Sequence, residues 1–185
     1  MIPIETNRLI LRQWRKKDFN LFSELNSDVD SMQYFPNILS QKESDSLAHK
    51  IKKNISINGW GLWAIEIKST GKFAGYVGLN KLKDDLPPSP CIEIGWRLLK
   101  CHWGFGYATE AGKRALKYAF NILHLNEVVA FTTLKNKKSI AVMHRLGMID
   151  AHKNFMHPNI DLSSSLCEHV LYKITKNMWG KFQEE

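Results

Sequence analysis

The chain has 185 residues, of which 44% are hydrophobic and 24% charged, so its length and composition are those of one soluble globular domain. No apolar run approaches the roughly 20 residues that a membrane helix needs, and the first residues lack the basic and apolar stretches of a secretory signal. The net charge of +8 favours polyanionic partners. We therefore expect a single domain over residues 1–185 with no membrane partner.

The N-terminal part of the chain predicts one strand followed by two helices. Residues 8–14 have the composition of an opening strand, and we expect Asp18 to cap a short helix after it. Ser40 and Glu43 have the spacing of a capping box, and apolar residues follow them at helical intervals. Gly59 is typical of the end of that second helix.

The middle of the chain predicts three strands. Two β-rich runs, at 62–68 and 73–82, are separated by a short turn sequence and indicate a hairpin. The proline-rich stretch 87–90 cannot continue a strand ladder and predicts a loop. It leads into a further strand at 91–99.

A long helix follows a glycine-containing loop and extends to about Leu123. Small and apolar residues recur along one face of it, which lets a helix lie close to a sheet. The residues on that face are Ala108, Ala111, Ala115, Ala119 and Ile122. The β-branched run 127–133 predicts the next strand.

The C-terminal part predicts a helix over 137–146, ending at Gly147, and two strands at about 149–156 and 168–175. Strands and helices thus alternate irregularly, without internal repeats or a linker. The pattern indicates one mixed α/β domain.

The three cysteines, Cys91, Cys101 and Cys167, are odd in number, widely spaced and without a C-x-x-C pair. This favours reduced thiols in the cytoplasm over a disulfide framework or a zinc site, and we predict no bound metal. The basic residues are spread along the chain in short clusters. Nucleic-acid binding is therefore disfavoured relative to a phosphate-rich ligand.

The loop between the strand at 91–99 and the long helix has the features of an anion site. The first turn of a helix has backbone N–H groups without partners and the positive end of the macrodipole. Gly104 and Gly106 lack the Cβ atoms that would keep a phosphate from that backbone. A mere tight turn stays the alternative.

Two common nucleotide motifs fit this loop poorly. A P-loop requires Lys and then Ser or Thr after its second glycine, whereas Tyr107 and Ala108 follow Gly106. A dinucleotide-binding fingerprint requires a third Gly or Ala where Thr109 stands, and an acidic residue that ends the next strand, whereas Glu127 begins it.

The loop instead resembles the phosphate loop of the GNAT acetyltransferases, which has the pattern Arg/Gln-x-x-Gly-x-Gly/Ala. Gly104 and Gly106 match its glycines, while Cys101 stands at the Arg/Gln position. Further stretches look like the ribosomal-protein N-terminal acetyltransferase-like branch of that family and cover essentially the whole chain. These stretches are 6–12, 93–99, 103–111, 136–148 and 169–175.

The resemblance implies a mixed, mostly antiparallel sheet of about seven strands, flanked by about four helices and splayed between strands 4 and 5. It implies an N-acetyltransferase in which an amine attacks acetyl-CoA directly, without a covalent enzyme intermediate. The acceptor would be a protein N-terminus, a peptide or a small amine, and the protein a monomer or homodimer. A catalytically silent acyl-CoA-binding module is the alternative. Loops around residues 28–40, 84–90 and 157–167 would set the acceptor.

The resemblance also implies the cofactor contacts. They would come from the strand end, the glycine loop, the first turn of the long helix and the start of the next one. These residues are Leu98, Leu99, Trp103, Gly104, Phe105, Gly106, Tyr107, Ala108, Thr109, Asn136 and Ser139. From its sequence context alone, Asn136 reads as the cap of the helix that follows it.

Glu93 matches a position at which several members of the family carry a catalytic glutamate, so the resemblance makes it the candidate general base. An ordinary strand or salt-bridge residue is the equal alternative. His157 and His169 are rival bases or substrate contacts, because an unperturbed histidine titrates near neutral pH. Many members place a tyrosine acid where Met143 stands. Methionine cannot donate a proton, so the acid would be Ser139 or a water, or the enzyme would have no general acid, as in some members of this branch.

Overall fold

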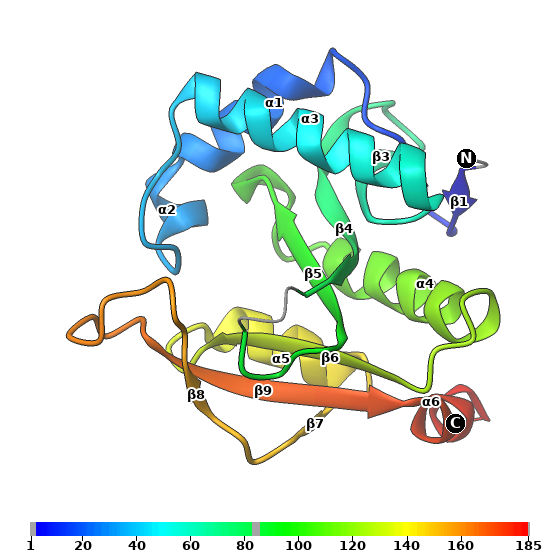
Figure 1. Ribbon diagram of the computed structural model, residues 1–185. Coiled ribbons are helices and arrows are strands. Elements are labelled where there is room, and N and C mark those ends of the chain that lie inside the picture. Colours follow the sequence, from blue (N-terminus) through cyan, green and yellow to red (C-terminus); the bar gives the residue numbers. More distant parts are fainter. Residues whose placement is uncertain (1–2, 83–85, 185) are drawn as a thin grey trace. The chain divides into compact units, whose positions relative to one another are not determined.

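The computed structural model describes residues 3–82 and 86–184, and the chain divides into two compact units. Unit 1 comprises residues 1–79 and 95–115, and unit 2 comprises residues 80–94 and 116–185. By their residue ranges, three elements that Figure 1 labels belong partly to each unit: β4 (Phe73–Lys81), β5 (Ile92–Leu98) and α4 (Tyr107–Asn121). Of the loop expected at 84–90, residues 84 and 85 lie outside the described residues.

Unit 1 consists of an antiparallel ladder with helices packed on it. The strand order is β1-β2-β3-β4, where β1 is Ile4–Glu5, β2 is Leu9–Arg12 and β3 is Leu62–Ile67. The helices α1 (Asp18–Ser27) and α3 (Gln41–Asn58) contact each other, and α3 also contacts β3. A short helix α2 (Val29–Met32), which the sequence did not predict, follows α1. The opening strand and the hairpin are confirmed.

Helix α3 begins and ends as its sequence predicts. The Ser40 side chain accepts a hydrogen bond from the backbone N–H of Glu43, and the Glu43 carboxylate accepts one from the backbone N–H of Ser40. Gly59 then adopts a left-handed φ of 77° at the C-terminus. A residue with a Cβ pays a steric penalty there, so glycine is the favoured stop.

The expected role of Asp18 as a helix cap is wrong. Asp18 is the first residue of α1 rather than its cap, and its carboxylate accepts hydrogen bonds from the Arg15 backbone and the Arg12 guanidinium. Both Asp18 and Arg12 are buried. The carboxylate is therefore committed to a buried ion pair, which spacing along the sequence does not reveal.

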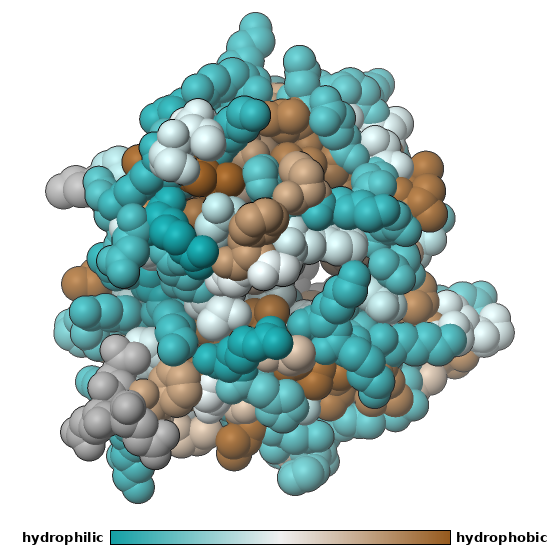
Figure 2. Space-filling model, turned by 180° about the vertical axis from the view of Figure 1, so that it is seen from behind, coloured by the Kyte–Doolittle hydropathy of each residue, from teal (hydrophilic) through white to brown (hydrophobic). Residues whose placement is uncertain are grey.

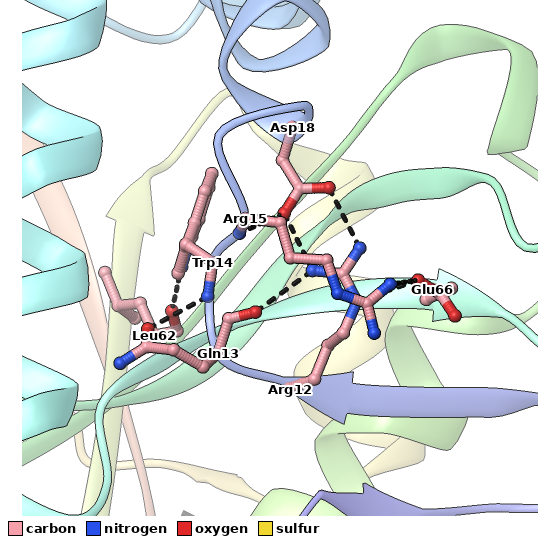
Figure 3. A network of polar contacts seen from close by, with 7 residues as sticks. All are labelled: Arg12, Gln13, Trp14, Arg15, Asp18, Leu62 and Glu66. Carbon is pink, nitrogen blue, oxygen red and sulfur yellow. Dashed lines mark hydrogen bonds and ion pairs between the residues drawn. The ribbon is translucent and has the colours of Figure 1, made fainter.

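Arg12 is the centre of a buried polar network in unit 1 (Figure 3). Its Nη1 and Nη2 atoms donate to both Asp18 oxygens at 2.7 and 2.9 Å, and its Nε donates to Glu66 at 2.8 Å. The exposed Arg15 also reaches Glu66, at 2.6 Å. Arg12 thus ties β2 to α1 and to β3 through charge-assisted hydrogen bonds.

A close approach of β4 to β5 fixes the strand end that enters the glycine loop. A Cβ at Gly75 would lie 2.2 Å from the Arg97 carbonyl oxygen and 2.7 Å from the Leu98 Cα, so only glycine fits there. The Leu99 N–H then donates to the Ala74 carbonyl. A 3₁₀ turn at Lys100–His102 follows.

Unit 2 is built around the long strand β9 (Glu168–Thr175). Strand β6 (Glu127–Thr133) pairs with it antiparallel along its full length. Helix α5 (Lys137–Arg145) contacts β6, and helix α6 (Lys176–Glu184) contacts β9. Phe120 of α4 stacks on Trp179 of α6, with ring centroids 5.9 Å apart. The sequence did not predict β1 or α6.

The strand expected at 149–156 is two separate short strands. β7 (Ile149–Asp150) and β8 (Phe155–Met156) each pair with β9, and His152 between them has a positive φ of 52°. That left-handed residue interrupts an extended chain.

The alanine-rich face of α4 is confirmed in part. Ala111, Ala115 and Ala119 are fully buried, as expected. Ile122 is wrong as a member of that face, because α4 ends at Asn121 and the Ile122 side chain is 60% exposed.

The fold class is confirmed as a mixed, mostly antiparallel α/β sheet. β5 and β6 are parallel and pair with Glu93 opposite Val129, and the splay expected between strands 4 and 5 stays a prediction. The described residues form nine strands and six α-helices, more than the seven and four expected. The additional elements are short or terminal.

The surface in Figure 2 is largely hydrophilic, with hydrophobic residues scattered over it. Such scattered apolar residues are ordinary for a globular protein. Within residues 3–82 and 86–184, no helix is long and apolar enough to span a membrane. The described residues also contain no cluster of three potential metal ligands.

We expect Arg12→Met to destabilise the protein by about 3–5 kcal/mol, because it leaves the Asp18 carboxylate buried without a counter-charge and leaves Glu66 with the exposed Arg15 alone. Arg15→Met is the matched control: it removes an exposed arginine from the same Glu66 and should cost at most about 1 kcal/mol. Urea unfolding measures both. Equal losses for the two variants would contradict a structural role specific to Arg12.

Candidate active site

The end of β5 and the turn after it hold the glycine loop in place. The Trp103 indole N–H donates to the Leu98 carbonyl oxygen at 2.9 Å. Leu98 is buried, and Leu99 is half-buried and bonded to β4 through its backbone. The loop therefore starts from a rigid strand end.

Both loop glycines adopt left-handed backbone conformations that other residues rarely take. Gly104 has a φ of 82° and Gly106 a φ of 79°. A Cβ on Gly104 would meet no heavy atom within 4 Å, so that side of the loop is open. The Gly106 carbonyl accepts the first helical hydrogen bond of α4, from Glu110. The N–H groups of the first turn thus remain available to an anion.

Arg8, which sequence reasoning did not single out, adds a positive charge beside this loop. Its Nη2 atom lies 3.5 Å from where a Cβ on Gly106 would stand. Its Nε donates to Glu110 of α4 at 2.6 Å, and its guanidinium lies over the Tyr107 ring, 4.8 Å from the centroid. Arg8 and Glu110 are far apart in sequence, so only the folded chain reveals this contact.

The other predicted loop residues are the aromatic pair Phe105 and Tyr107 and two small residues of the first turn of α4. The Phe105 ring stacks on the Tyr107 ring with centroids 5.7 Å apart, and Phe105 is 57% exposed. Ala108 and Thr109 lie in the first turn of α4 and are half-buried. Cys101, at the position of the family's Arg or Gln, is exposed on the preceding turn.

Glu93 lies on β5 in unit 2, with Val129 of β6 opposite it. Burial raises the pKa of Glu93 to about 7, although a hydrogen bond from the Asn80 side chain favours the charged form. A carboxyl group with that pKa exchanges its proton close to neutral pH. The half-buried Glu93 therefore differs from an exposed strand residue, and its role as the general base stays a prediction.

Cys91, two residues before Glu93, cannot serve as a nucleophile near neutral pH. Burial is the largest cause that raises the pKa of its thiol, and the negative charges of Glu93 and Glu127 raise it further, to about 11. The thiol therefore stays protonated, and thiolate is the reactive form. All three cysteines are free in the structure.

The start of α5 combines a cap with an unengaged hydroxyl. The Asn136 side-chain oxygen accepts from the Ser139 N–H at 3.1 Å, which confirms the cap, and its amide donates to Thr132. The half-buried Ser139 hydroxyl makes no hydrogen bond within the described residues. Met143, one turn later, is buried, so the usual tyrosine position holds a core residue here.

His157 and His169 lie together in an aromatic cluster of unit 2. Their ring centroids are 5.0 Å apart, and Phe131 and Phe155 complete the cluster. Burial lowers the pKa of His169, against a hydrogen bond with the Cys167 carbonyl oxygen. His169 is thus a neutral, structurally engaged histidine at neutral pH.

The comparison with known proteins decides the family. The family model of the acetyltransferase (GNAT) domain matches residues 8–149 of this chain. The chain belongs to the GNAT acetyltransferase family. The resemblance seen in the sequence is confirmed, and with it an acetyl-CoA-dependent N-acetyltransferase that transfers acetyl groups to amines.

Individual relatives agree with this family. The chain is 32% identical to the uncharacterised protein YkkB of Bacillus subtilis (strain 168), over 77% of this chain and 83% of that protein. It is 24% identical to the uncharacterised N-acetyltransferase YnaD of the same organism, over 96% and 99% of the two chains. A GNAT acetyltransferase structure from Bacillus anthracis matches with a TM-score of 0.79 at 23% identity, over 95% and 99% of the two chains. The likeness to that structure confirms the fold, and the branch within the family stays a prediction.

The predicted site residues of this acetyltransferase divide between the two units. Unit 1 brings together the cofactor residues from Leu98 to Thr109, and Arg8 joins them. Unit 2 contains Glu93, Asn136, Ser139 and the two histidines, and within it His157 and His169 are in contact. Asn136 and Ser139 are joined by the helix cap.

We expect Glu93→Gln to stabilise the protein increasingly as pH rises. Between about pH 4.5 and 7 the Glu93 carboxyl keeps its proton in the folded chain, whereas in the unfolded chain it has already lost it. The free energy of unfolding therefore falls as the pH rises through that range. Glutamine resembles the protonated form and removes this loss, with a gain of roughly 1–3 kcal/mol at pH 8 and little at pH 4.5. Thermal unfolding at several pH values measures it. Glu127→Gln, which removes an exposed carboxylate of β6, is the control, and a pH-independent difference for Glu93→Gln would contradict the buried carboxyl.

Proposed function

We propose that Glu93 is the general base of this acetyltransferase and deprotonates a primary amine before the amine attacks the thioester of acetyl-CoA. The observation that carries the proposal is the pKa of about 7, because a base is most effective when its pKa is close to the working pH. At neutral pH the amine is mostly protonated and must lose a proton before it can attack. Glu93 accepts that proton directly or through water.

We also propose that the glycine loop holds the pyrophosphate of acetyl-CoA. The open side of Gly104 leaves room for a phosphate, and the first-turn N–H groups of α4 would donate to it. Arg8 supplies the charge that Cys101 cannot, since its Nη2 atom borders Gly106. The bound cosubstrate supplies the activated acetyl group. Leu98, Leu99 and Asn136 would contact its remaining length.

Ser139 is proposed as the proton donor, or hydrogen-bond donor, to the departing thiolate. Its hydroxyl has no partner in the described chain, and the first turn of α5 adds the partial positive charge of a helix N-terminus. Buried Met143 cannot take this role. Because Asn136 already caps α5, its contact with acetyl-CoA would use the remaining amide hydrogen.

We propose that residues 1–185 act as one cytoplasmic acetyltransferase domain, as a monomer or homodimer. The family match over residues 8–149 includes parts of both units, which supports a single functional domain. The acceptor is a protein N-terminus, a peptide or a small amine.

Gly104→Val should weaken acetyl-CoA binding by at least about 10-fold, because a branched side chain would fill the open side of the loop and strain a φ of 82°. Gly59→Val is the matched control: it has a φ of 77° and equally open surroundings, but stands at the end of α3. Calorimetry with acetyl-CoA measures both variants. Comparable binding by the two would exclude the loop as the phosphate site.

Glu93→Gln should lower kcat/KM by roughly 10²-fold or more at neutral pH while acetyl-CoA affinity is retained. Raising the pH should recover part of the rate, since more of the amine then arrives deprotonated. Release of free thiol from acetyl-CoA, measured across a panel of amines and pH values, tests this. Parallel pH profiles for parent and variant would transfer the role of base to His157 or His169. Acetyl-CoA binding without turnover on any amine would favour the silent module.

A further inference from the structure

A carboxylate stands in the first turn of α4, directly after the loop that is proposed to bind the pyrophosphate of acetyl-CoA. It belongs to Glu110, whose backbone N–H bonds to the carbonyl oxygen of Gly106. A negative charge beside a phosphate repels it, so this carboxylate by its charge alone would weaken the binding of acetyl-CoA. Its contacts give the reason for its place.

Both oxygens of Glu110 bind the N-terminal segment of unit 1 rather than the N–H groups of α4. Oε1 accepts from the Thr6 hydroxyl at 2.6 Å and from the Arg8 backbone N–H at 2.9 Å. Oε2 accepts from the Arg8 Nε at 2.6 Å. Burial opposes the charged form of Glu110, but these hydrogen bonds outweigh it and lower the pKa, so the carboxyl group is ionised at neutral pH.

Arg8 projects from a turn whose backbone is already fixed. The Thr6 N–H donates to the Leu9 carbonyl oxygen at 2.9 Å, and the Leu9 N–H donates to the Thr6 hydroxyl oxygen, also at 2.9 Å. Leu9 begins β2 and is fully buried. The place of the Arg8 backbone is therefore set by the sheet, and only its long side chain needs to be held.

Two groups hold the guanidinium of Arg8 beside the loop. Glu110 engages its Nε, and the Tyr107 ring, which stacks on Phe105, lies 4.8 Å from its centre. Its Nη2 atom lies 3.5 Å from where a Cβ on Gly106 would stand, and the side chain is 50% exposed, so a ligand can reach it. Holding a flexible arginine in advance lowers the entropy that binding an anion would cost.

We infer that Glu110 is a positioning residue for the cosubstrate: it holds Arg8 so that the Nη atoms face the pyrophosphate of acetyl-CoA at Gly106. This role rests on the proposed function, since it takes the glycine loop as the phosphate site. Every residue that it involves lies in unit 1. The three hydrogen bonds to Glu110 also spread its charge, which reduces the repulsion of the phosphate.

The variant Glu110→Gln distinguishes positioning from simple electrostatics by the sign of its effect. If the carboxylate acts through its charge alone, its removal should tighten acetyl-CoA binding. If it positions Arg8, binding should weaken, because in either orientation the glutamine amide places an N–H against an N–H of Arg8. We expect binding that is weaker by roughly 10-fold, measured by calorimetry with acetyl-CoA. Unchanged or tighter binding would overturn the inference.

Glu5→Gln is the matched control for the change in net charge. It removes another carboxylate of unit 1, which pairs with Lys68 instead of an arginine at the loop. Its acetyl-CoA affinity should not fall. A loss equal to that of Glu110→Gln would show that the specific contact with Arg8 is not the cause, and would overturn the inference.

A double-mutant cycle tests whether Glu110 acts through Arg8. Arg8→Met alone should weaken acetyl-CoA binding by roughly 10-fold or more. Glu110→Gln added to Arg8→Met should cause no further loss, because no guanidinium remains to be positioned. Losses that simply add would mean that the two residues act independently, and would overturn the inference.

Truncated cosubstrates separate a lost phosphate contact from damage to the fold. S-acetylpantetheine has neither the pyrophosphate nor the 3′-phosphate, so its kcat/KM, followed by thiol release, should be the same for the parent and Glu110→Gln. Acetyl-dephospho-CoA lacks only the 3′-phosphate and should show the full loss. An equal loss with S-acetylpantetheine would indicate a purely structural role, and a loss that vanishes with acetyl-dephospho-CoA would assign the contact to the 3′-phosphate. Either result overturns the inference.

Failure of the inference can be told from failure of the proposed function. If Gly104→Val binds acetyl-CoA as tightly as the parent, the glycine loop is not the phosphate site, and the proposed function fails with it. If Gly104→Val weakens binding while Glu110→Gln tightens it, the loop stands and the positioning role alone is overturned. Weaker binding by both variants supports the two together.

Discussion

The buried guanidinium of Arg12 fixes the geometry of unit 1. Removing three charged groups from water is costly, and the cost is offset only because both carboxylates bond directly to the arginine. The result is a defined register between β2, α1 and β3. Arg8, which immediately precedes β2, is thereby held where Glu110 of α4 can engage it. The charge beside the glycine loop thus depends on an ion cluster that takes no part in binding.

Three arginines of unit 1 differ in how far the protein neutralises them. Arg12 is buried between two carboxylates and has no charge left for a ligand. Arg8 has one partner, Glu110, and a free Nη2 that borders the loop. Arg97 has none within the described residues and is held by an amide, a thioether and two rings. Since an anion gains most from a charge that is positioned but not already paired, the doubly paired Arg12 is the least suited of the three to bind a ligand.

Local signals along the sequence predicted most of the secondary structure. The capping box of Ser40 and Glu43 and the left-handed Gly59 are rules about neighbouring residues, and the structure confirms them. The failures concern distant contacts. Asp18 forms an ion pair with Arg12 instead of capping its helix, and α6 owes part of its packing to rings such as Phe120. Periodicity carries no information about such partners.

In the candidate site, too, features set by neighbouring residues could be predicted, and features set by distant contacts could not. Gly104 and Gly106 could be predicted because a glycine before a helix has a local meaning, whereas the contact of Arg8 with Glu110 joins residues 102 positions apart. The pKa of Glu93 was equally hidden, since it depends on the elements that bury the side chain. Resemblance to the family could propose this residue as a base, but only the fold supplies the physical reason. The sequence therefore identified candidate residues of the site, but it did not reveal the contacts and the burial that determine their chemical properties.

The pKa of Glu93 also bears on which amines can serve as acceptors. The α-amine of a polypeptide has a pKa near 8 and a lysine side chain one near 10.4. Proton transfer to a carboxylate with a pKa of about 7 is therefore uphill by roughly 1 kcal/mol for the α-amine and by roughly 5 kcal/mol for the lysine. Burial of Glu93 reduces this cost for every amine, but it leaves the difference between the two classes intact. With Glu93 as the base, an α-amine is the acceptor that this enzyme deprotonates most readily.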